Sequence, residues 1–215
     1  MSLPPKSLPM VLFYLVMGLG VVTILILLNY TTGFSLLLIV LSLTLIFAVL
    51  AVSSIMLPQL TGAPWVPTSR ELVHEILAIA DLKPGELLYD LGSGDGRLVI
   101  AAAMDFGARS AGIEIDPFRV LYSRIKAVQL GLKGKVKIIR GNFFNVDLRE
   151  ADVVVTFLLQ ETNDRLQEKL ERELTKSNCR VVSLVFQFKG WEEIKTDKEK
   201  MIRVYRPRPF LHTLS

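Results

Sequence analysis

The sequence contains very few residues of the types that form disulfides or metal sites. Its 215 residues include one cysteine, Cys179, and two histidines, His74 and His212. A single cysteine excludes a disulfide within the chain and any metal site built from several cysteines. We expect both histidines to be solvated or packing side chains, so no metal site is predicted.

Charge is almost absent from the first part of the chain. Residues 1–61 contain one charged side chain, Lys6, whereas residues 62–215 hold the other 24 Lys and Arg and all 21 Asp and Glu. Two uncharged runs, residues 10–28 and 34–57, contain 19 and 24 residues. As helices they would be about 29 and 36 Å long, against a hydrocarbon core of about 30 Å. The sequence therefore predicts a two-helix transmembrane hairpin in residues 1–61, followed by a second domain in residues 62–215.

The charges that flank the predicted spans indicate their orientation. The turn at residues 29–33 carries no positive charge, while Lys6, Arg70 and Lys83 flank the other ends. The positive-inside rule then places residues 62–215 on the cytoplasmic side of a two-pass membrane protein. Because neither span contains an ionisable residue, we expect an anchor rather than an ion pathway. A cleaved signal peptide is disfavoured, since its apolar region is only about 7 to 15 residues long.

Residues 62–215 alternate between strand-like and helix-like patterns. Strands are expected at 87–91, 110–115, 136–140, 153–157 and 181–186, with helices at 68–80, 98–106, 118–130 and about 163–174. Two further strands are expected around Ile194 and at 201–205, with Pro207 and Pro209 marking a sheet edge. Because the strand runs are apolar on both faces, the fold class predicted is α/β, a doubly wound parallel sheet covered by helices.

A glycine-rich turn, Asp90 to Arg97, follows the first of these strands. Its glycines allow a tight turn and a close approach to a ligand at the start of the next helix. Their Gly-x-Gly-x-Gly spacing fits the dinucleotide fingerprint poorly, and no Gly-Lys-Ser/Thr is present for a P-loop. The carboxylates of Asp90 and Asp95 would repel a pyrophosphate but suit a cationic amino-acid group or a sulfonium. An ordinary strand-to-helix turn is the alternative interpretation.

The next strand ends in an acidic residue, Glu114, 22 residues after Gly92. A carboxylate in this position can accept hydrogen bonds from ribose hydroxyls. Together with the turn at 90–97, the segments 112–116 and 141–143 resemble the first three motifs of class I S-adenosylmethionine-dependent methyltransferases. The resemblance implies a Rossmann-like class I methyltransferase fold with S-adenosylmethionine as cofactor.

The same resemblance assigns the cofactor-binding residues. It implies that Asp90 and the glycine turn hold the methionine end, that Glu114 binds the ribose, and that Asn142 and Phe143 lie beside the adenine. Many relatives have Asp in place of Asn142. The full set of candidate cofactor-binding residues is Asp90, Gly92, Ser93, Gly94, Asp95, Gly96, Glu114, Asp116, Asn142 and Phe143.

A narrower resemblance involves the segment before the first helix of the second domain. With the turn at 90–97, residues 64–68 are similar to those of the small protein-lysine methyltransferases that modify the mitochondrial ATP synthase c-subunit and adenine nucleotide translocase, and of their archaeal relatives. We expect Trp65, Pro67 and Thr68 to belong to a flap that closes over cofactor or substrate. A packing plug at the sheet edge is the alternative.

The segment after the fourth strand, residues 157–161, bears on the acceptor. It lacks the Asn/Asp-Pro-Pro-aromatic stretch of many methyltransferases that act on DNA or small amines, so no nucleic acid is expected as a partner. Glu161, or Gln160 through its carbonyl, is the candidate for orienting an acceptor amine. Alternatively, Glu161 only stabilises the N-terminus of the following helix.

Three functions remain open at this point. The favoured one is a membrane-anchored, S-adenosylmethionine-dependent protein-lysine methyltransferase, whose partners are the lipid bilayer and a protein substrate at or near it. The second is a methyltransferase for a lipophilic small molecule such as a quinone or a lipid, and the third is a cofactor-binding module without catalysis. A basic C-terminal stretch, Lys189 to Arg208, offers possible contact with lipid phosphate.

Overall fold

The computed structural model describes residues 16–27, 34–61 and 68–208. It divides into two compact units, Met1–Met56 and Leu57–Ser215. Residues 16–27 are helical and lie in the first unit. The helix α2 (Phe34–Thr61) begins in the first unit, ends in the second and contains no charged residue. Within the residues whose side chains are described, no helix is both long enough and apolar enough to cross a membrane. The predicted transmembrane hairpin is not supported by these residues, and parts of the predicted first span, 10–15 and 28, lie outside them.

After α2, the described chain continues in the second unit with the helix α3 (Arg70–Ile79). Its N-cap is Ser69, whose hydroxyl accepts a hydrogen bond of 3.2 Å from the backbone N–H of Leu72. The helix predicted at 68–80 thus begins two residues later, after an N-cap at Ser69 rather than at Thr68. Both residues have a hydroxyl suited to capping, and the choice between them depends on backbone conformation rather than on residue type.

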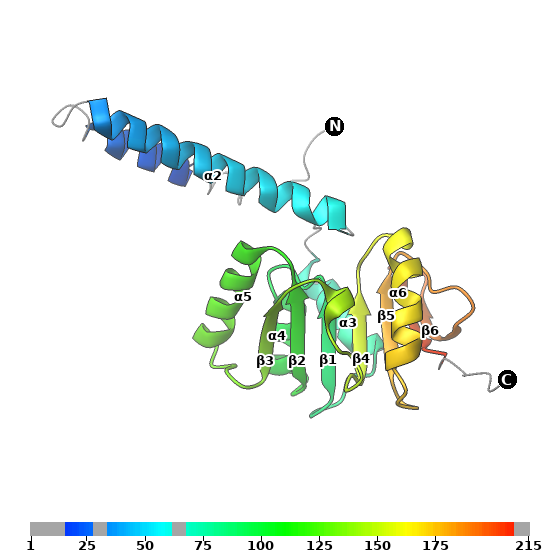
Figure 1. Cartoon of the computed structure of the whole chain (residues 1–215). Coiled ribbons are helices and arrows are strands. Elements are labelled where there is room, and N and C mark those ends of the chain that lie inside the picture. The colour runs from blue at the N-terminus through cyan, green and yellow to red at the C-terminus, as the bar shows by residue number, and fades with distance from the viewer. Residues whose placement is uncertain (1–15, 28–33, 62–67, 209–215) are drawn as a thin grey trace. The chain divides into compact units, whose positions relative to one another are not determined.

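A seven-stranded sheet forms the centre of this unit (Figure 1). Its strands are β1 (Leu87–Leu91), β2 (Arg109–Glu114), β3 (Val136–Arg140), β4 (Val153–Thr156), β5 (Arg180–Leu184), β6 (Glu192–Asp197) and β7 (Ile202–Arg206). The order across the sheet is β3-β2-β1-β4-β5-β7-β6, so the chain reverses its direction of travel between β1 and β4. In open α/β sheets, ligands bind at the carboxyl ends of the strands beside such a reversal.

The last two strands differ from the prediction of a parallel sheet. Strands β1 to β5 are parallel, but β7 pairs antiparallel with β5, and β6 pairs antiparallel with β7. At this end of the sheet the edge strand is therefore β6. The strand β7, which precedes Pro207, lies between β5 and β6. The proline follows the last paired residue, Arg206, and so disrupts no hydrogen bond of the ladder.

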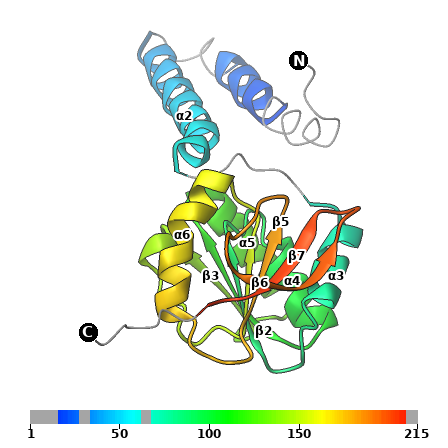
Figure 2. The same cartoon turned by 90° about the vertical axis from the view of Figure 1, so that its right-hand side faces the viewer.

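Helices cover both faces of the sheet (Figures 1 and 2). On one face, α3, α4 (Arg97–Asp105) and α5 (Pro117–Gln129) pack on a core that includes Val99, Val153 and Val155. On the other, α6 (Gln160–Glu173) packs through Leu166 and Leu170. The central strands β4 and β5 are buried on both sides, which explains their apolar sequences, whereas the outer strands β3 and β6 are partly exposed.

The helix α6 begins three residues earlier than predicted. Sequence alone favours a start at Asn163, because Asn is a common N-cap residue. In the structure the N-cap is Leu159, which makes no side-chain capping bond, and Asn163 lies within the helix. Gln160 and Glu161 are consequently the first two residues of α6, at the carboxyl end of β4.

Candidate active site

The turn between β1 and α4 depends on three glycines with positive φ. Gly92, Gly94 and Gly96 have φ values of +91°, +56° and +75°. Residues with a side chain rarely adopt this conformation, so the Gly-x-Gly-x-Gly pattern is a requirement of the backbone. The turn is fastened to the neighbouring strand, because the N–H groups of Gly92 and Ser93 both donate to the Ile113 carbonyl, at 2.9 and 3.0 Å.

A fourth glycine, Gly112 in β2, leaves space for the side chain of Ser93. A Cβ atom on Gly112 would lie 2.6 Å from Ser93 Oγ and 2.7 Å from Ser93 Cβ. Ser93 is buried, and its hydroxyl has no hydrogen-bond partner among the described residues. Such an unsatisfied buried group is uncommon in folded proteins and suits a position that donates to or accepts from a ligand.

The carboxylate of Glu114 joins the turn to the end of β2. Its Oε2 accepts a hydrogen bond of 2.9 Å from the N–H of Gly94, and its Oε1 accepts one of 2.9 Å from the N–H of Asp116. Burial raises the pKa of Glu114, and these N–H groups oppose the increase. A carboxylate has about four acceptor positions, so two remain for other donors. Asp116 is also the N-cap of α5, where its Oδ1 accepts from the N–H of Phe118 at 2.8 Å.

Three carboxylates surround the glycine turn. Asp90 is buried at the end of β1, and its burial, together with the negative charges of Glu114 and Asp95, raises its pKa to about 7. Burial also acts to raise the pKa of Asp95, but the hydrogen bonds and charge of Arg97 outweigh it and lower that pKa. Arg97 Nη2 lies 2.6 Å from Asp95 Oδ2. A cationic ligand would stabilise the ionised form of Asp90.

Arg97 also connects the turn to the segment that precedes α3. Its Nη1 donates a hydrogen bond to the carbonyl of Thr68, one of the three residues predicted for the flap. Trp65 and Pro67, the other two, lie outside the described residues. The structure thus brings the last predicted flap residue to the start of α4 through a contact that the sequence analysis did not identify.

Sequence reasoning also missed Ser123, a fully buried residue of α5. Its hydroxyl lies 3.1 Å from the Gly94 carbonyl and 2.7 Å from the Arg119 carbonyl, and its side chain leaves little space for a Cβ at position 96. A Cβ on Gly96 would lie 3.0 Å from Ser123 Cβ. A single serine in an amphipathic helix carries no sequence signal for such a role.

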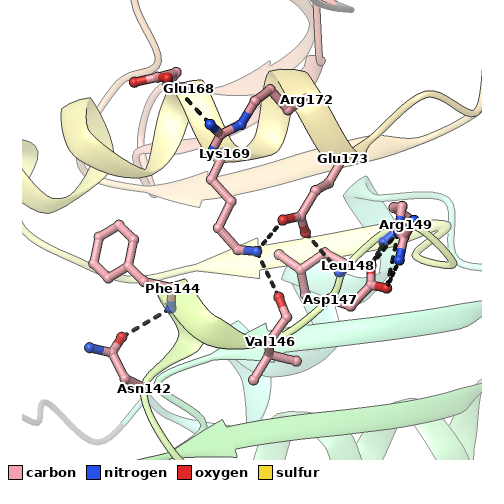
Figure 3. A network of polar contacts seen from close by, with 10 residues as sticks. All are labelled: Asn142, Phe144, Val146, Asp147, Leu148, Arg149, Glu168, Lys169, Arg172 and Glu173. Atoms are coloured by element: carbon pink, nitrogen blue, oxygen red, sulfur yellow. Dashed lines mark hydrogen bonds and ion pairs between the residues drawn. The ribbon is translucent and has the colours of Figure 1, made fainter.

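Asn142 and Phe143 lie after β3, at the start of the short 3-10 helix η1 (Phe143–Asn145). The Asn142 side chain accepts a hydrogen bond of 3.0 Å from the N–H of Phe144 and so caps η1 (Figure 3). The Phe143 and Phe144 rings are in contact, with centroids 4.9 Å apart. The predicted adenine-side residues therefore occur together at the carboxyl end of β3.

Helix α6 holds the loop that continues from η1. The buried Lys169 donates through Nζ to the Val146 carbonyl at 2.7 Å and to the Glu173 carboxylate (Figure 3). Glu173 in turn accepts from the N–H of Leu148 at 2.9 Å. Arg165 lies over the Phe144 ring, 5.1 Å from its centroid. These positioning contacts were not predicted, because charges in a helix of this composition normally indicate a solvated face.

The two residues predicted to orient the acceptor differ in their surroundings. Glu161 is exposed in the first turn of α6. Gln160 Nε2 donates to the carbonyl of Gln187 at 2.9 Å, and Gln160 Oε1 accepts from the N–H of Gln187 at 3.0 Å. Gln160 thus holds the chain after β5.

A further polar group lies beside Gln160. Asn163 is fully buried and donates to Ser183 Oγ at 3.2 Å, whereas its Oδ1 has no partner among the described residues. Ser183 Oγ donates to the Phe186 carbonyl at 2.6 Å, across a turn where Val185 has a φ of +67°. A β-branched residue with positive φ is a strained conformation, and such strain concentrates at functional sites.

These groups form an acidic, glycine-lined site at the carboxyl ends of β1, β2 and β3. Among residues 16–27, 34–61 and 68–208, no group of His, Cys, Asp and Glu side chains is arranged to hold a metal ion. The buried carboxylates, the unsatisfied Ser93 hydroxyl and the remaining acceptor positions of Glu114 fit a ligand that carries both positive charge and ribose hydroxyls. The fold and this site define a class I S-adenosylmethionine-dependent methyltransferase.

Comparison with known proteins identifies the family. Residues 90–195 match the model of the ANTKMT methyltransferase domain. A protein-lysine N-methyltransferase of Saccharolobus islandicus is 43% identical over 142 residues, which are 64% of this chain and 88% of that protein. The chain therefore belongs to this methyltransferase family and is an S-adenosylmethionine-dependent enzyme, as the motif resemblance implied.

Mammalian relatives match over a smaller share of their length. The mouse ATP synthase c-subunit lysine N-methyltransferase is 33% identical over 74% of this chain and 65% of its own length. The mouse adenine nucleotide translocase lysine N-methyltransferase is 34% identical over 69% of this chain and 64% of its own. The match thus spans just under two thirds of these two relatives.

Solved structures agree with the fold. An RNA methyltransferase from Salinibacter ruber in complex with S-adenosyl-L-homocysteine has a TM-score of 0.61 and 40% sequence identity, over 65% of this chain and 91% of that one. A mutant of MtNAS in complex with S-adenosylmethionine, with a TM-score of 0.55 over 65% of this chain and 61% of that one, is 20% identical and supports the fold alone.

Proposed function

We propose that this enzyme transfers a methyl group from S-adenosylmethionine to a lysine side chain of a protein substrate, and that residues 1–61 anchor it at a membrane. The observation that carries the first part is the 43% identity to the Saccharolobus islandicus protein-lysine N-methyltransferase over nearly that whole protein. The acidic glycine turn supports the choice of cofactor.

Each end of the cofactor corresponds to one group of residues. Asp90 and the turn at Gly92 to Gly96 would hold the methionine end, since buried carboxylates stabilise its ammonium and sulfonium charges. Glu114 would accept from the ribose hydroxyls with its two remaining acceptor positions. Asn142 and Phe143 would border the adenine. When bound, the cofactor supplies an electrophilic methyl group on a sulfonium.

The acceptor lysine needs little machinery beyond alignment. An amine attacks a sulfonium methyl in line once it has lost its proton, and proximity supplies much of the rate. Glu161 and Gln160 follow β4 in the first turn of α6, and in this proposal the amine approaches there. Asn163 Oδ1, which has no partner within the described part of the chain, is a further acceptor for its N–H. Glu161 is our candidate for orienting the amine, with Asn163 Oδ1 as a second acceptor, and Gln160 is our candidate for positioning the chain around Gln187.

The proposal of a membrane anchor rests on composition. Residues 1–61 contain a single charged side chain, and the described apolar side chains of α2 between Leu37 and Val49 are mostly exposed. A chain with so many exposed apolar groups requires a partner that covers them. The domain would then lie on the cytoplasmic side, near substrates in or beside the bilayer.

One experiment tests the acceptor. The purified enzyme is incubated with S-adenosylmethionine that carries a radioactive methyl group and with membranes from its own host, and the products are divided into protein, lipid and RNA fractions. The proposal predicts label in protein, in methylated lysine after hydrolysis. Label confined to the lipid fraction would replace it with a lipophilic small-molecule acceptor, and label confined to RNA with the activity named for the Salinibacter ruber protein.

A further inference from the structure

Helix α5 has an apolar face that is exposed in the described structure. Six of the nine large apolar side chains that are exposed within residues 68–208 lie on α5 or directly after it. They are Phe118, Leu121, Tyr122, Ile125, Val128 and Leu130, with exposed fractions between 42% and 62%. The opposite face of the helix, with Val120, Ser123 and Ala127, is buried against the sheet.

The first five of these side chains follow the period of a helix. The spacing from Phe118 through Leu121, Tyr122 and Ile125 to Val128 is i, i+3, i+4, i+7 and i+10, which places them on one side. We define them as the α5 stripe. On an ordinary helix at the surface of a soluble domain this side carries polar and charged residues. A contiguous apolar stripe there indicates an interaction surface.

The charge around the α5 stripe is mainly positive, although Arg119 is paired with the buried Asp116 at 4.0 Å. Residues 117–146 contain seven Lys and Arg and no Asp or Glu, whereas the rest of the chain has 18 basic and 21 acidic residues, a net charge of −3. The seven are Arg119, Arg124, Lys126, Lys133, Lys135, Lys137 and Arg140. The positive net charge of this protein is therefore concentrated on α5, the edge strand β3 and the loop that joins them.

The basic residues of α5 itself lie along the borders of the apolar stripe. At 100° per residue, Arg124 falls on one border of the stripe and Arg119 and Lys126 on the other. Arg124 is fixed by two hydrogen bonds to the Ile138 carbonyl, at 3.1 and 2.8 Å. Lys126 Nζ lies 5.8 Å from the centroid of the Tyr122 ring. The helix thus has an apolar face with basic residues along both borders.

The basic C-terminal stretch, which the sequence suggested for lipid contact, is different. Arg206 lies 3.0 Å from Glu192, Arg203 lies 3.6 Å from Glu193, and Lys200 is paired with Glu75. With Lys189, which lies 3.9 Å from Asp164, four of its seven Lys and Arg side chains are in ion pairs. This stretch has a net charge of +3 and one exposed large apolar side chain, Met201, whereas the region around α5 has a net charge of +7 and six such side chains.

We propose that the α5 stripe and its basic borders form a membrane-contact surface that binds a bilayer containing anionic lipids. An apolar face with basic borders is the signature of a helix that lies in the interface, with apolar groups at the acyl boundary and cations at the phosphates. Two other occupants of this surface fit less well. A second copy of the chain would bring two strongly basic segments together. RNA would place its phosphates against the apolar side chains of the α5 stripe.

This surface does not include residues 1–61 and has no role in the methyl-transfer step. It would nevertheless determine how the active site lies relative to the membrane. The stripe begins at Phe118, two residues after Asp116. Like the glycine turn, this start of α5 lies at the carboxyl ends of the parallel strands. Contact between α5 and the bilayer would therefore hold these strand ends close to the headgroups. Substrates at the membrane surface would then lie within reach.

The test uses the full chain, labelled on single introduced cysteines. Ile125→Cys and Leu121→Cys report on the α5 stripe, and Lys198→Cys, an exposed residue beside the opposite edge strand β6, is the matched control. The native Cys179 is buried and its burial raises its pKa to about 12, so it resists labelling at neutral pH. Each variant carries the fluorophore NBD and is reconstituted with vesicles that contain a nitroxide-labelled lipid.

We expect quenching at positions 125 and 121 in vesicles of phosphatidylglycerol and phosphatidylcholine that is at least about twofold stronger than at position 198. It should decrease in pure phosphatidylcholine and at about 1 M salt, where the Debye length is only about 3 Å. Equal quenching at the three positions, or none at 125 and 121, would overturn the proposal. So would a fluorescence change at 125 with RNA, or with protein concentration, in the absence of any effect of lipid.

Two different measurements distinguish the proposed α5 surface from the proposed membrane anchor in residues 1–61. Flotation with pure phosphatidylcholine vesicles that resists alkaline extraction reports on residues 1–61, whereas the lipid-dependent quenching reports on α5. Thermal unfolding of each labelled variant should match the unlabelled protein, because the substituted side chains are exposed. A protein that floats without quenching at 125 supports the anchor and contradicts the α5 surface.

Discussion

The N–H of Gly94 donates a 2.9 Å hydrogen bond to the carboxylate of Glu114, which lies at the end of the adjacent strand. The bond fixes the turn after β1 against the residue expected to bind the ribose. A second bond, from the N–H of Asp116 to the same carboxylate, fixes the start of α5. One buried side chain therefore sets the relative positions of the three segments that surround the cofactor.

Replacement of Glu114 by alanine is expected to weaken S-adenosylmethionine binding. Hydrogen bonds to a charged group contribute about 1.5 to 3 kcal/mol each, so a loss of about 10-fold to 100-fold in affinity is expected. Isothermal calorimetry measures the effect. Glu75→Ala, which removes an exposed acid of α3, is the control and should bind normally. An unchanged Kd for Glu114→Ala would exclude the ribose role.

The stability of the cofactor-free protein should depend on pH through Asp90. Burial and two neighbouring carboxylates raise the pKa of Asp90 from 3.8 to about 7, so the folded protein retains a proton that the unfolded chain has lost. Stability therefore falls as the pH rises across that interval. Asp90→Asn removes this dependence and should raise the Tm more at pH 8 than at pH 5. An equal Tm difference at the two pH values would contradict this assignment.

The packing of Ser93 against Gly112 predicts a coupled pair of substitutions. Gly112→Ala places a Cβ 2.6 Å from Ser93 Oγ and should destabilise the protein by about 1 to 3 kcal/mol. Ser93→Gly in the same chain removes the obstructing side chain and should recover part of the loss. Urea unfolding of both single variants and the double variant measures the coupling. Strict additivity would show that the two residues are not in contact.

Two variants of α6 separate an acceptor contact from a structural one. Glu161→Gln should lower kcat for the acceptor and leave Tm unchanged, because this side chain is exposed. Gln160→Ala should lower both kcat and Tm, since its hydrogen bonds to the Gln187 backbone are lost. Steady-state kinetics and thermal unfolding measure both effects. Full activity of Glu161→Gln would remove it as the group that orients the amine.

The sequence predicted the alternating strands and helices that build the parallel part of the sheet. Apolar runs such as Val153–Val155 mark buried parallel strands, and β3 was predicted with the bounds it has in the structure. The positions of β6 and β7 were not predictable in the same way. Their order depends on pairing with β5 from far along the chain, which periodicity does not encode.

The site shows the same division. The motif that contains Gly92, Gly94 and Gly96 was recognisable, because backbone conformation demands glycine at those positions. Ser123 and Lys169 were not recognised, since one serine and one lysine in a helix have many ordinary roles. Their contacts with Gly94 and Val146 arise only when α5 and α6 pack on the sheet.

The most direct test of the proposed function is mass spectrometry of lysine residues in membrane proteins after incubation with the purified enzyme and S-adenosylmethionine. We predict lysine side chains that gain one or more methyl groups with the natural enzyme. At S-adenosylmethionine concentrations near the Kd of the natural enzyme, the same lysines should gain far less methyl with a Glu114→Ala variant that remains folded. Unchanged lysines, accompanied by a newly methylated lipid or quinone in the same membranes, would contradict the proposal.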